Sequence, residues 1–439
     1  MTAMMLDRVS KIYDGGMLAV EDVSLSAEAG ELLVLVGPSG CGKTTILRMI
    51  AGLEEPTRGE VWLGGEPATG LPPQERNVAM VFQHGALYPH RSVRGNMAFP
   101  LVIAGVEGPA IEARVEEMAH GLGIAATLER WPGRLSGGER QRVAMGRALI
   151  RGEPEVLLMD EPLASLDVGL RTGLRAEIAA LVRSMRLTTV YVTHDQAEAL
   201  ALADRVAVMR DGAIEDVGPP MRVYQEPATA FTAAFLSSPP IILAWAMIWL
   251  VSGDRVVIDF GRQHMDLAWA HPRSEALTPY HADSVLVGIR PEALTPSRAG
   301  QEGAQLRGRI SSLDYLGHEW HARLEVGFRP VDLDAVGRRP RRPAPPSRGG
   351  AGGRHARVLQ RVLELVRARR NGARVAPAEP DHSGEHRGAH LLLRLDSPGD
   401  WAVGQEVGIH IDLQRVHFFD RDGRRIGATP RWPVAGDHP

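Results

Sequence analysis

The hydrophobic residues of the first half of the chain form short continuous runs separated by stretches of helical periodicity. Three runs, at 31–36, 156–159 and 188–192, are rich in β-branched residues, and each is followed by loop-forming residues and a helical pattern. Buried strands that alternate with helices are typical of a parallel sheet covered on both faces. We therefore predict an α/β domain at 1–236, with a helical subdomain at about 88–156.

The pattern changes near residue 236, where the sequence becomes strand-like and irregular. Residues 285–289, 322–326 and 390–395 have the composition of strands and are bounded by turn-forming residues. No comparable helical periodicity accompanies them. We therefore predict that 237–439 forms a small β-rich domain.

The stretch 337–388 stands apart from the rest of this second half. It contains eleven arginines between Arg338 and Arg370 against one acidic residue, Glu364, together with clusters of proline and glycine. Such a composition buries too little apolar surface to offset the entropy of ordering, so we predict a disordered insertion, with room for one short amphipathic helix at 358–366. A contact with RNA or another polyanion is the alternative, although aromatic residues for base stacking are missing.

Composition adds only a little to the prediction of fold and function. A chain of 439 residues is expected to hold two or three domains, and its formal net charge of -3 gives no reason to expect nucleic acid as a partner. The single cysteine, Cys41, excludes an internal disulfide and suits a reducing compartment. Charges interrupt the N-terminal segment, and the longest apolar run, 241–251, is about half the length of a membrane span. We therefore expect a soluble protein that is not exported.

The first candidate for chemistry is Gly37-Pro-Ser-Gly-Cys-Gly-Lys-Thr-Thr45, which fits the pattern G-x-x-x-x-G-K-[ST]. It lies between a predicted strand and a helical pattern, the context that a phosphate-binding loop requires. Glycines let backbone N–H groups approach the phosphates, and the helix N-terminus adds its positive dipole end. Lys43 is expected to neutralise the β and γ oxygens, and Thr44 to bind Mg²⁺. The predicted phosphate contacts are Gly37, Pro38, Ser39, Gly40, Cys41, Gly42, Lys43, Thr44 and Thr45.

Two adjacent carboxylates, Asp160 and Glu161, follow the run 156–159. The carboxyl ends of parallel strands face the crevice in which α/β sheets bind ligands. Because successive strand side chains point in opposite directions, we expect separate roles. Asp160 is predicted to hold Mg²⁺ through water, and Glu161 to orient and deprotonate the attacking water. Alone, the pair would fit an acidic loop equally well; the phosphate loop upstream favours the catalytic interpretation.

A second anion site is predicted at Leu135-Ser-Gly-Gly-Glu-Arg-Gln-Arg142. Ser136 is a natural N-cap, the two glycines permit close backbone approach, and 143–149 continues as a helix. Since the first loop already occupies one end of the nucleotide, we expect this site to serve a nucleotide bound to another copy of the chain.

In this order, the motifs of 1–236 resemble those of an ABC transporter nucleotide-binding domain, which has a RecA-like core and a helical subdomain. The resemblance implies that Gln83 touches Mg²⁺ and senses the permease, and that His194 contacts the γ-phosphate. It also implies that Tyr13 stacks on adenine and that Asp167, in Ser165-Leu-Asp167, belongs to the D-loop. Lys43, Glu161 and His194 are then the catalytic residues, and ATP and Mg²⁺ the cofactors.

The segment around Ser136 resembles the signature motif of this family, formed here by Ser136, Gly137, Gly138 and Glu139. Glu139 departs from the pattern, because the family most often has glutamine there, and a carboxylate so near the phosphates puts its direct role in question. In the family two copies pack head to tail, so each ATP lies between the glycine loop of one copy and the signature motif of the other.

Finer similarities point to import. Residues 86–90, 191–198 and 235–240 closely resemble ATPases of maltose, trehalose and glycerol-3-phosphate importers, and 288–292 and 416–420 resemble their oligonucleotide-binding-like TOBE domain. The resemblance implies a sugar or oligosaccharide, such as trehalose or a maltose-like sugar, as the solute. It further implies two transmembrane permease subunits, an extracytoplasmic solute-binding protein and a location on the cytoplasmic face of a bacterial inner membrane.

Two kinds of alternative remain at this point. Import ATPases for other solutes, namely polyamines, ferric iron, sulfate or glycerol-3-phosphate, share most of these motifs. ABC ATPases of DNA repair or of ribosomes form a different class, but the former normally split the motifs with a long coiled coil and the latter carry two sets per chain. Neither feature is visible here, and a simple phosphate-loop kinase would lack the motif at Ser136.

Overall fold

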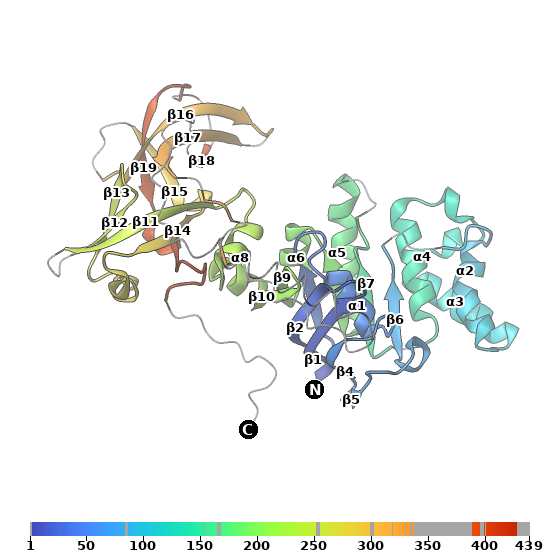
Figure 1. Ribbon diagram of the computed structural model, residues 1–439. Coiled ribbons are helices and arrows are strands. Elements are labelled where there is room, and N and C mark those ends of the chain that lie inside the picture. Colours follow the sequence, from blue (N-terminus) through green and yellow to red (C-terminus); the bar gives the residue numbers. More distant parts are fainter. Residues whose placement is uncertain are drawn as a thin grey trace, which may run out of the picture.

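The structure is a computed structural model in which an elongated arrangement places a β domain, an α/β core and a helical subdomain in a row (Figure 1). It describes residues 2–83, 87–152, 154–164, 168–251, 255–298, 303–317, 319–329, 331–333, 336–337, 389–395, 399 and 401–427. The predicted insertion lies outside these residues apart from Gly337, so its disorder and the helix at 358–366 stay predictions.

The α/β core is built on a six-stranded sheet with the strand order β10-β9-β3-β8-β7-β6. All neighbours are parallel except β9 and β10. The strands are β3 (Leu32–Val36), β6 (Val78–Val81), β7 (Val156–Asp160), β8 (Thr189–Thr193), β9 (Arg205–Arg210) and β10 (Ala213–Gly218). Every residue of β3, β7 and β8 is buried, which confirms the three predicted strands.

Helices and a second, antiparallel sheet cover the two faces of this core. The helices are α1 (Lys43–Ile50), α5 (Val168–Met185), α6 (Gln196–Leu202), α7 (Pro220–Gln225) and α8 (Ala230–Phe235). The second sheet has the order β2-β1-β4-β5, with β1 (Thr2–Tyr13), β2 (Met17–Glu28), β4 (Arg58–Leu63) and β5 (Glu66–Pro67). Buried side chains of α1 pack between the two sheets and so fix where this helix begins.

The helical subdomain comprises α2 (Val93–Ile103), α3 (Gly108–Gly121) and α4 (Gly137–Leu149). Its core includes Met97 of α2, Val115 of α3 and Val143 of α4. Short 3₁₀ turns at Ala125–Thr127 and Pro132–Arg134 connect α3 to α4, and another lies at Pro73–Glu75 before β6. Figure 1 shows α4 between α2 and α3 on one side and β6 on the other.

The second half of the chain forms two five-stranded antiparallel sheets around one core. The first has the order β13-β12-β11-β14-β20, with β11 (Ile242–Val251), β12 (Arg255–Asp259), β13 (His264–Ala268), β14 (Ser284–Ile289) and β20 (His417–Phe419). The second has the order β15-β19-β16-β17-β18, with β15 (Leu294–Arg298), β16 (Leu306–Tyr315), β17 (Trp320–Phe328), β18 (Ala389–Leu395) and β19 (Glu406–Ile411). The connections hold α9 (Ser274–Leu277) and 3₁₀ turns at Thr278–Tyr280, Pro291–Ala293 and Leu413–Arg415.

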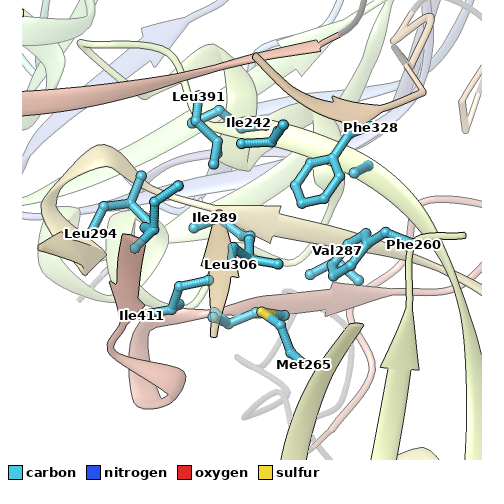
Figure 2. Close-up of a cluster of buried hydrophobic side chains, with 14 of the residues drawn as sticks. Ile242, Phe260, Met265, Val287, Ile289, Leu294, Leu306, Phe328, Leu391 and Ile411 are labelled. Carbon is cyan, nitrogen blue, oxygen red and sulfur yellow. The ribbon is translucent and has the colours of Figure 1, made fainter. Parts of the chain in front are cut away.

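The predicted β domain is therefore confirmed, and its core explains the long apolar run. That run forms β11, a central strand that pairs with β12 and β14. Its side chains meet those of both sheets in the core shown in Figure 2, where Phe260 and Phe328 stack with ring centroids 4.3 Å apart. Among the helices described, none combines the length and the apolar composition needed to cross a bilayer.

Candidate functional site

The phosphate-loop candidate lies between the end of β3 and the start of α1. Two of its glycines are required by space: a Cβ on Gly37 would lie 2.3 Å from the Met209 carbonyl oxygen, and one on Gly42 would lie 2.5 Å from that of Ala19. Gly42 also has a φ of 105°, which L side chains rarely adopt. No side chain caps the N-terminus of α1. The first turn of α1 therefore presents the kind of N–H groups that bind anions.

Lys43 begins α1 and folds back over the loop. Its ammonium donates hydrogen bonds to the carbonyl oxygens of Gly37 and Pro38, both at 2.8 Å, and the residue is only 4% exposed. Cys41 Sγ lies 3.7 Å from the same nitrogen, and burial raises the pKa of this thiol, so it stays protonated. The positive charge of Lys43 is thus held within the loop that is predicted to wrap the phosphates.

Two predicted Mg²⁺ ligands, Thr44 of α1 and Asp160 of β7, lie side by side at the carboxyl end of the parallel strands. Thr44 Oγ1 donates a hydrogen bond to Asp160 Oδ1 at 3.2 Å. Burial raises the pKa of the Asp160 carboxyl, and the hydrogen bond from Thr44 opposes this shift. A hydroxyl and a carboxylate side by side are hard oxygen donors of the type that Mg²⁺ prefers.

Glu161 brings three of the predicted site residues together. Its Oε2 accepts a hydrogen bond from Gln83 Nε2 at 3.1 Å and lies 3.2 Å from His194 Nδ1. Gln83 follows β6 and His194 follows β8, so the carboxyl ends of three neighbouring strands contribute one residue each. The residues predicted to contact Mg²⁺, the attacking water and the γ-phosphate therefore meet at a single carboxylate.

The separation of Asp160 from Glu161 has a different origin from the predicted one. We expected the pleat of a strand to point the two side chains in opposite directions, but β7 ends at Asp160. Glu161 has a φ of 44°, in the left-handed region, and its N–H donates to the Val192 carbonyl oxygen at 3.0 Å. A non-glycine residue in this region costs free energy and is common at functional sites. The backbone turn, rather than the pleat, aims the carboxylate.

A buried carboxylate that the sequence patterns did not single out supports His194. Glu198, on α6, is 3% exposed and accepts hydrogen bonds from the Tyr191 hydroxyl at 3.0 Å and the Thr193 hydroxyl at 2.8 Å. Thr193 in turn accepts from the N–H of Asp195, whose carboxylate caps α6. The residues on both sides of His194 are therefore held by one network.

We expect Glu198→Ala to lower kcat for ATP hydrolysis by about tenfold while KM changes little, because the histidine loses its support but keeps its chemistry. The variant also leaves two buried hydroxyls without an acceptor, which costs about 1 to 3 kcal/mol of stability. Glu198→Gln retains an acceptor oxygen and serves as the matched variant. Equal damage by both, measured by steady-state kinetics and thermal unfolding, would contradict this role.

The signature-motif residues begin α4 as predicted. Ser136 is the N-cap: its hydroxyl accepts from the Glu139 N–H at 3.2 Å, and the Glu139 carboxylate accepts from the Ser136 N–H at 2.7 Å. This reciprocal pair is a capping box. Ser136 is exposed, Gly137 is half-buried and Gly138 is buried.

The capping box explains the acidic residue at the fourth position of the motif. The hydrogen bond from the Ser136 backbone lowers the pKa of Glu139, and Arg130 lies 3.6 Å from its carboxylate. The negative charge is thus matched locally by an N–H group and a cation.

We expect Glu139→Ala to destabilise the start of α4 by about 0.5 to 2 kcal/mol and to raise KM for ATP. Glu139→Gln should behave like the parent chain within about twofold, since an amide oxygen can take the place of the carboxylate in the cap. Chemical unfolding and steady-state ATPase assays measure both quantities. A glutamine variant as impaired as the alanine variant would show that the charge itself is needed.

The structure says less about two other predicted site residues, Tyr13 and Asp167. Tyr13 ends β1, is half-buried and lies under the ammonium of Lys11, 5.1 Å from its ring centroid. Asp167, with the rest of the predicted D-loop, lies outside the described residues. Their roles stay predictions.

The glycine loop between β3 and α1, together with Asp160 and Glu161 at the carboxyl end of β7 in the same sheet, is the arrangement of a phosphate-loop nucleotide hydrolase. Family profiles agree: the one described as ABC transporter matches residues 20–164, and the one described as TOBE domain matches 287–351. The sequence is 45% identical to the trehalose/maltose import ATP-binding protein of Thermococcus litoralis, over 74% of this chain and 89% of that protein.

Further relatives extend the match over almost the whole length. The sn-glycerol-3-phosphate import ATP-binding protein of Rhodopseudomonas palustris is 38% identical over 97% of this chain and 99% of its own. The sulfoquinovosyl glycerol transport ATP-binding protein of Agrobacterium fabrum is 44% identical over 74% and 88%. The chain therefore belongs to the family of ATP-binding subunits of ABC importers: it binds ATP and is an ATPase.

Proposed function

We propose that this chain drives the import of a sugar, or of a polyol phosphate, by hydrolysing ATP in a dimer on the cytoplasmic face of the membrane. The observation that carries the proposal is the carboxylate of Glu161, which contacts Gln83 and His194 at the carboxyl ends of three neighbouring strands. This is the arrangement that a water-activating base beside a phosphate loop needs.

In the proposed mechanism the loop residues Gly37 to Thr45 bind the phosphates through N–H groups, and Lys43 turns its ammonium from the loop carbonyls to the β and γ oxygens. Thr44, Asp160 and Gln83 would hold Mg²⁺, which supplies positive charge to the transferring phosphoryl group when bound. Tyr13 stacks on the adenine ring.

Glu161 accepts the proton of the attacking water, while His194 donates a hydrogen bond to the γ-phosphate. Because Gln83 and His194 both contact Glu161, a displacement of either one also moves the base. Positioning and electrostatics therefore supply most of the catalysis.

The second half of each site comes from another copy. In one chain the described hydrogen bonds of Ser136 stay within the first turn of α4, and the residue is exposed, as a surface that meets a partner requires. We propose a head-to-tail dimer in which Ser136, Gly137, Gly138 and Glu139 of one copy face the loop around Lys43 of the other, with Asp167 beside them. Closure of this dimer would drive two permease subunits that receive solute from an extracytoplasmic binding protein.

The solute class is proposed from the relatives, whose names refer to trehalose and maltose, sn-glycerol 3-phosphate and sulfoquinovosyl glycerol. The test is to purify the chain with the permeases encoded beside it, reconstitute them in vesicles with the matching binding protein, and measure ATP-dependent uptake of labelled trehalose, maltose and glycerol 3-phosphate. Uptake of one of these supports the proposal. ATP-dependent uptake of a polyamine, ferric iron or sulfate alone would refute the solute class, and no uptake of any solute would refute the transport role.

A further inference from the structure

One arginine of the α/β core is bonded to the backbone of the β domain. The strand β9 lies on the side of the core that faces the β domain, and Arg210 is its last residue (Figure 1). Arg210 is 6% exposed, and its terminal nitrogens donate hydrogen bonds to the carbonyl oxygens of Leu333 at 2.9 Å and Val336 at 3.0 Å. Its guanidinium also lies over the ring of Phe231 on α8, 4.6 Å from the centroid. A single side chain thus holds two carbonyl groups of the neighbouring domain.

The residues that accept these hydrogen bonds are fixed to the β domain by apolar packing. They belong to 331–333 and 336–337, which follow β17 and which we call the anchor segment. Val336 is buried in a cluster that joins α8 to β11, β14 and β20, and Val331 and Leu333 pack against the same cluster. The hydrogen bonds therefore tie the end of β9 to the position of the β domain.

The same end of β9 also contacts the phosphate-loop residues directly. The carbonyl oxygen of Met209 lies so close to Gly37 that a Cβ on this glycine would be 2.3 Å away from it. On the other side of Arg210, the N–H of Gly212 donates a hydrogen bond to the carbonyl oxygen of Cys41 at 3.0 Å. The loop therefore touches the backbone both before and after the arginine that holds the anchor segment.

The turn that follows Arg210 has little freedom to absorb a displacement. Only Asp211 and Gly212 form it, because Arg210 pairs with Ala213 across the hairpin of β9 and β10. Their φ angles are 48° and 88°, and positive φ at both central residues is the geometry of a tight two-residue hairpin turn. A shift of Arg210 is therefore expected to move the Gly212 N–H as well, and with it the loop carbonyl that this N–H holds.

We propose that Arg210 is a positioning residue for the phosphate loop, through which the docked β domain sets the affinity of that loop for ATP. The contacts run from the anchor segment to the guanidinium, and from there along the backbone of 209–212 to Gly37 and Cys41. The inference concerns ATP binding alone and holds whichever solute the transporter carries.

This role predicts a particular kinetic effect. The phosphate loop contacts the phosphates both before and during hydrolysis, and none of the residues around Glu161 takes part in the contacts of Arg210. Loss of an interaction that is equally strong in the ground state and the transition state raises KM and leaves kcat unchanged. Removal of the Arg210 guanidinium should therefore weaken ATP binding without slowing the chemical step.

The single cysteine of the chain serves as a probe of the loop that does not depend on turnover. Cys41 is 4% exposed, and its carbonyl is the one that Gly212 holds. In the full chain without nucleotide, Arg210→Met, which removes all the donors, should increase the rate of Cys41 modification by a chromogenic disulfide reagent about fivefold or more. The same variant should bind ATP about fivefold more weakly in equilibrium titration, with kcat within about twofold of the parent value.

Tyr224→Phe is the matched control. It removes a hydrogen bond across the same domain boundary, from the Tyr224 hydroxyl to Glu292 Oε1 at 2.7 Å, that involves neither β9 nor the phosphate loop. Both variants should melt at a lower temperature than the parent chain. At a temperature well below either transition, only Arg210→Met should change the reactivity of Cys41 and the affinity for ATP.

Two further substitutions at the same position complete the test. Arg210→Lys keeps a cation that can donate to one of the two carbonyls, so both of its values should lie between those of the parent chain and of Arg210→Met. Should Arg210→Met fail to fold, Arg210→Gln replaces it. Unchanged Cys41 reactivity and ATP affinity in the folded variant would overturn the proposal. Equal changes in Tyr224→Phe would overturn it too, because they would trace the effect to a general loosening of the domain boundary.

Discussion

Replacing Glu161 with glutamine is expected to reduce ATP hydrolysis by about a hundredfold or more while ATP still binds. Glutamine has the size of glutamate and keeps an oxygen that can lie near Gln83 and His194, but it cannot accept the proton of the attacking water. The loop residues that hold the phosphates, including Lys43, are untouched. Turnover is measured by phosphate release and binding by equilibrium titration with ATP.

The same variant tests the dimer. If ATP joins two copies and hydrolysis separates them, blocked hydrolysis should cause an ATP-dependent dimer to accumulate, visible by size-exclusion chromatography. Glu112→Gln, an exposed glutamate on α3, makes the same chemical change away from the site and should hydrolyse ATP normally. Normal turnover in Glu161→Gln would remove the assigned role, and a monomer at saturating ATP would speak against the shared site.

Replacing Lys43 with alanine is expected to weaken ATP binding by about a hundredfold, because a buried ammonium that faces two phosphates contributes charge-assisted hydrogen bonds. It also removes the two hydrogen bonds that the structure shows to the Gly37 and Pro38 carbonyl oxygens. The loop itself should therefore lose order as well as affinity.

Lys43→Arg is the informative companion. It keeps the charge, but a planar guanidinium is larger than an ammonium, and the position is almost fully enclosed. We expect ATP binding at least tenfold weaker than in the parent chain. The melting temperature should change less, relative to the parent chain, than it does in the alanine variant. Full affinity in Lys43→Arg would show that charge alone suffices and that the enclosed geometry is unimportant. Fluorescence titration with a labelled nucleotide and thermal unfolding provide both measurements.

Local patterns in the sequence predicted the elements that carry the chemistry. The continuous apolar runs became β3, β7 and β8, because a strand buried on both faces has no polar positions. The glycine loop and the serine cap at Ser136 were equally readable, since backbone conformation and capping depend on neighbours only a few residues apart. The sequence patterns also predicted the TOBE-like β domain, although they did not predict which of its strands pair with one another.

Tertiary structure decided how distant residues meet. Gln83 and His194 reach Glu161 from strands separated by scores of residues, and only the parallel order of β6, β7 and β8 brings their ends together. The left-handed turn at Glu161 and the buried support from Glu198 have no signature in a single sequence. The sequence by itself determined the motifs from which nucleotide binding is predicted, because each of them is contiguous in the chain. Folding alone decided their geometry, because burial and contact depend on segments that no local pattern joins.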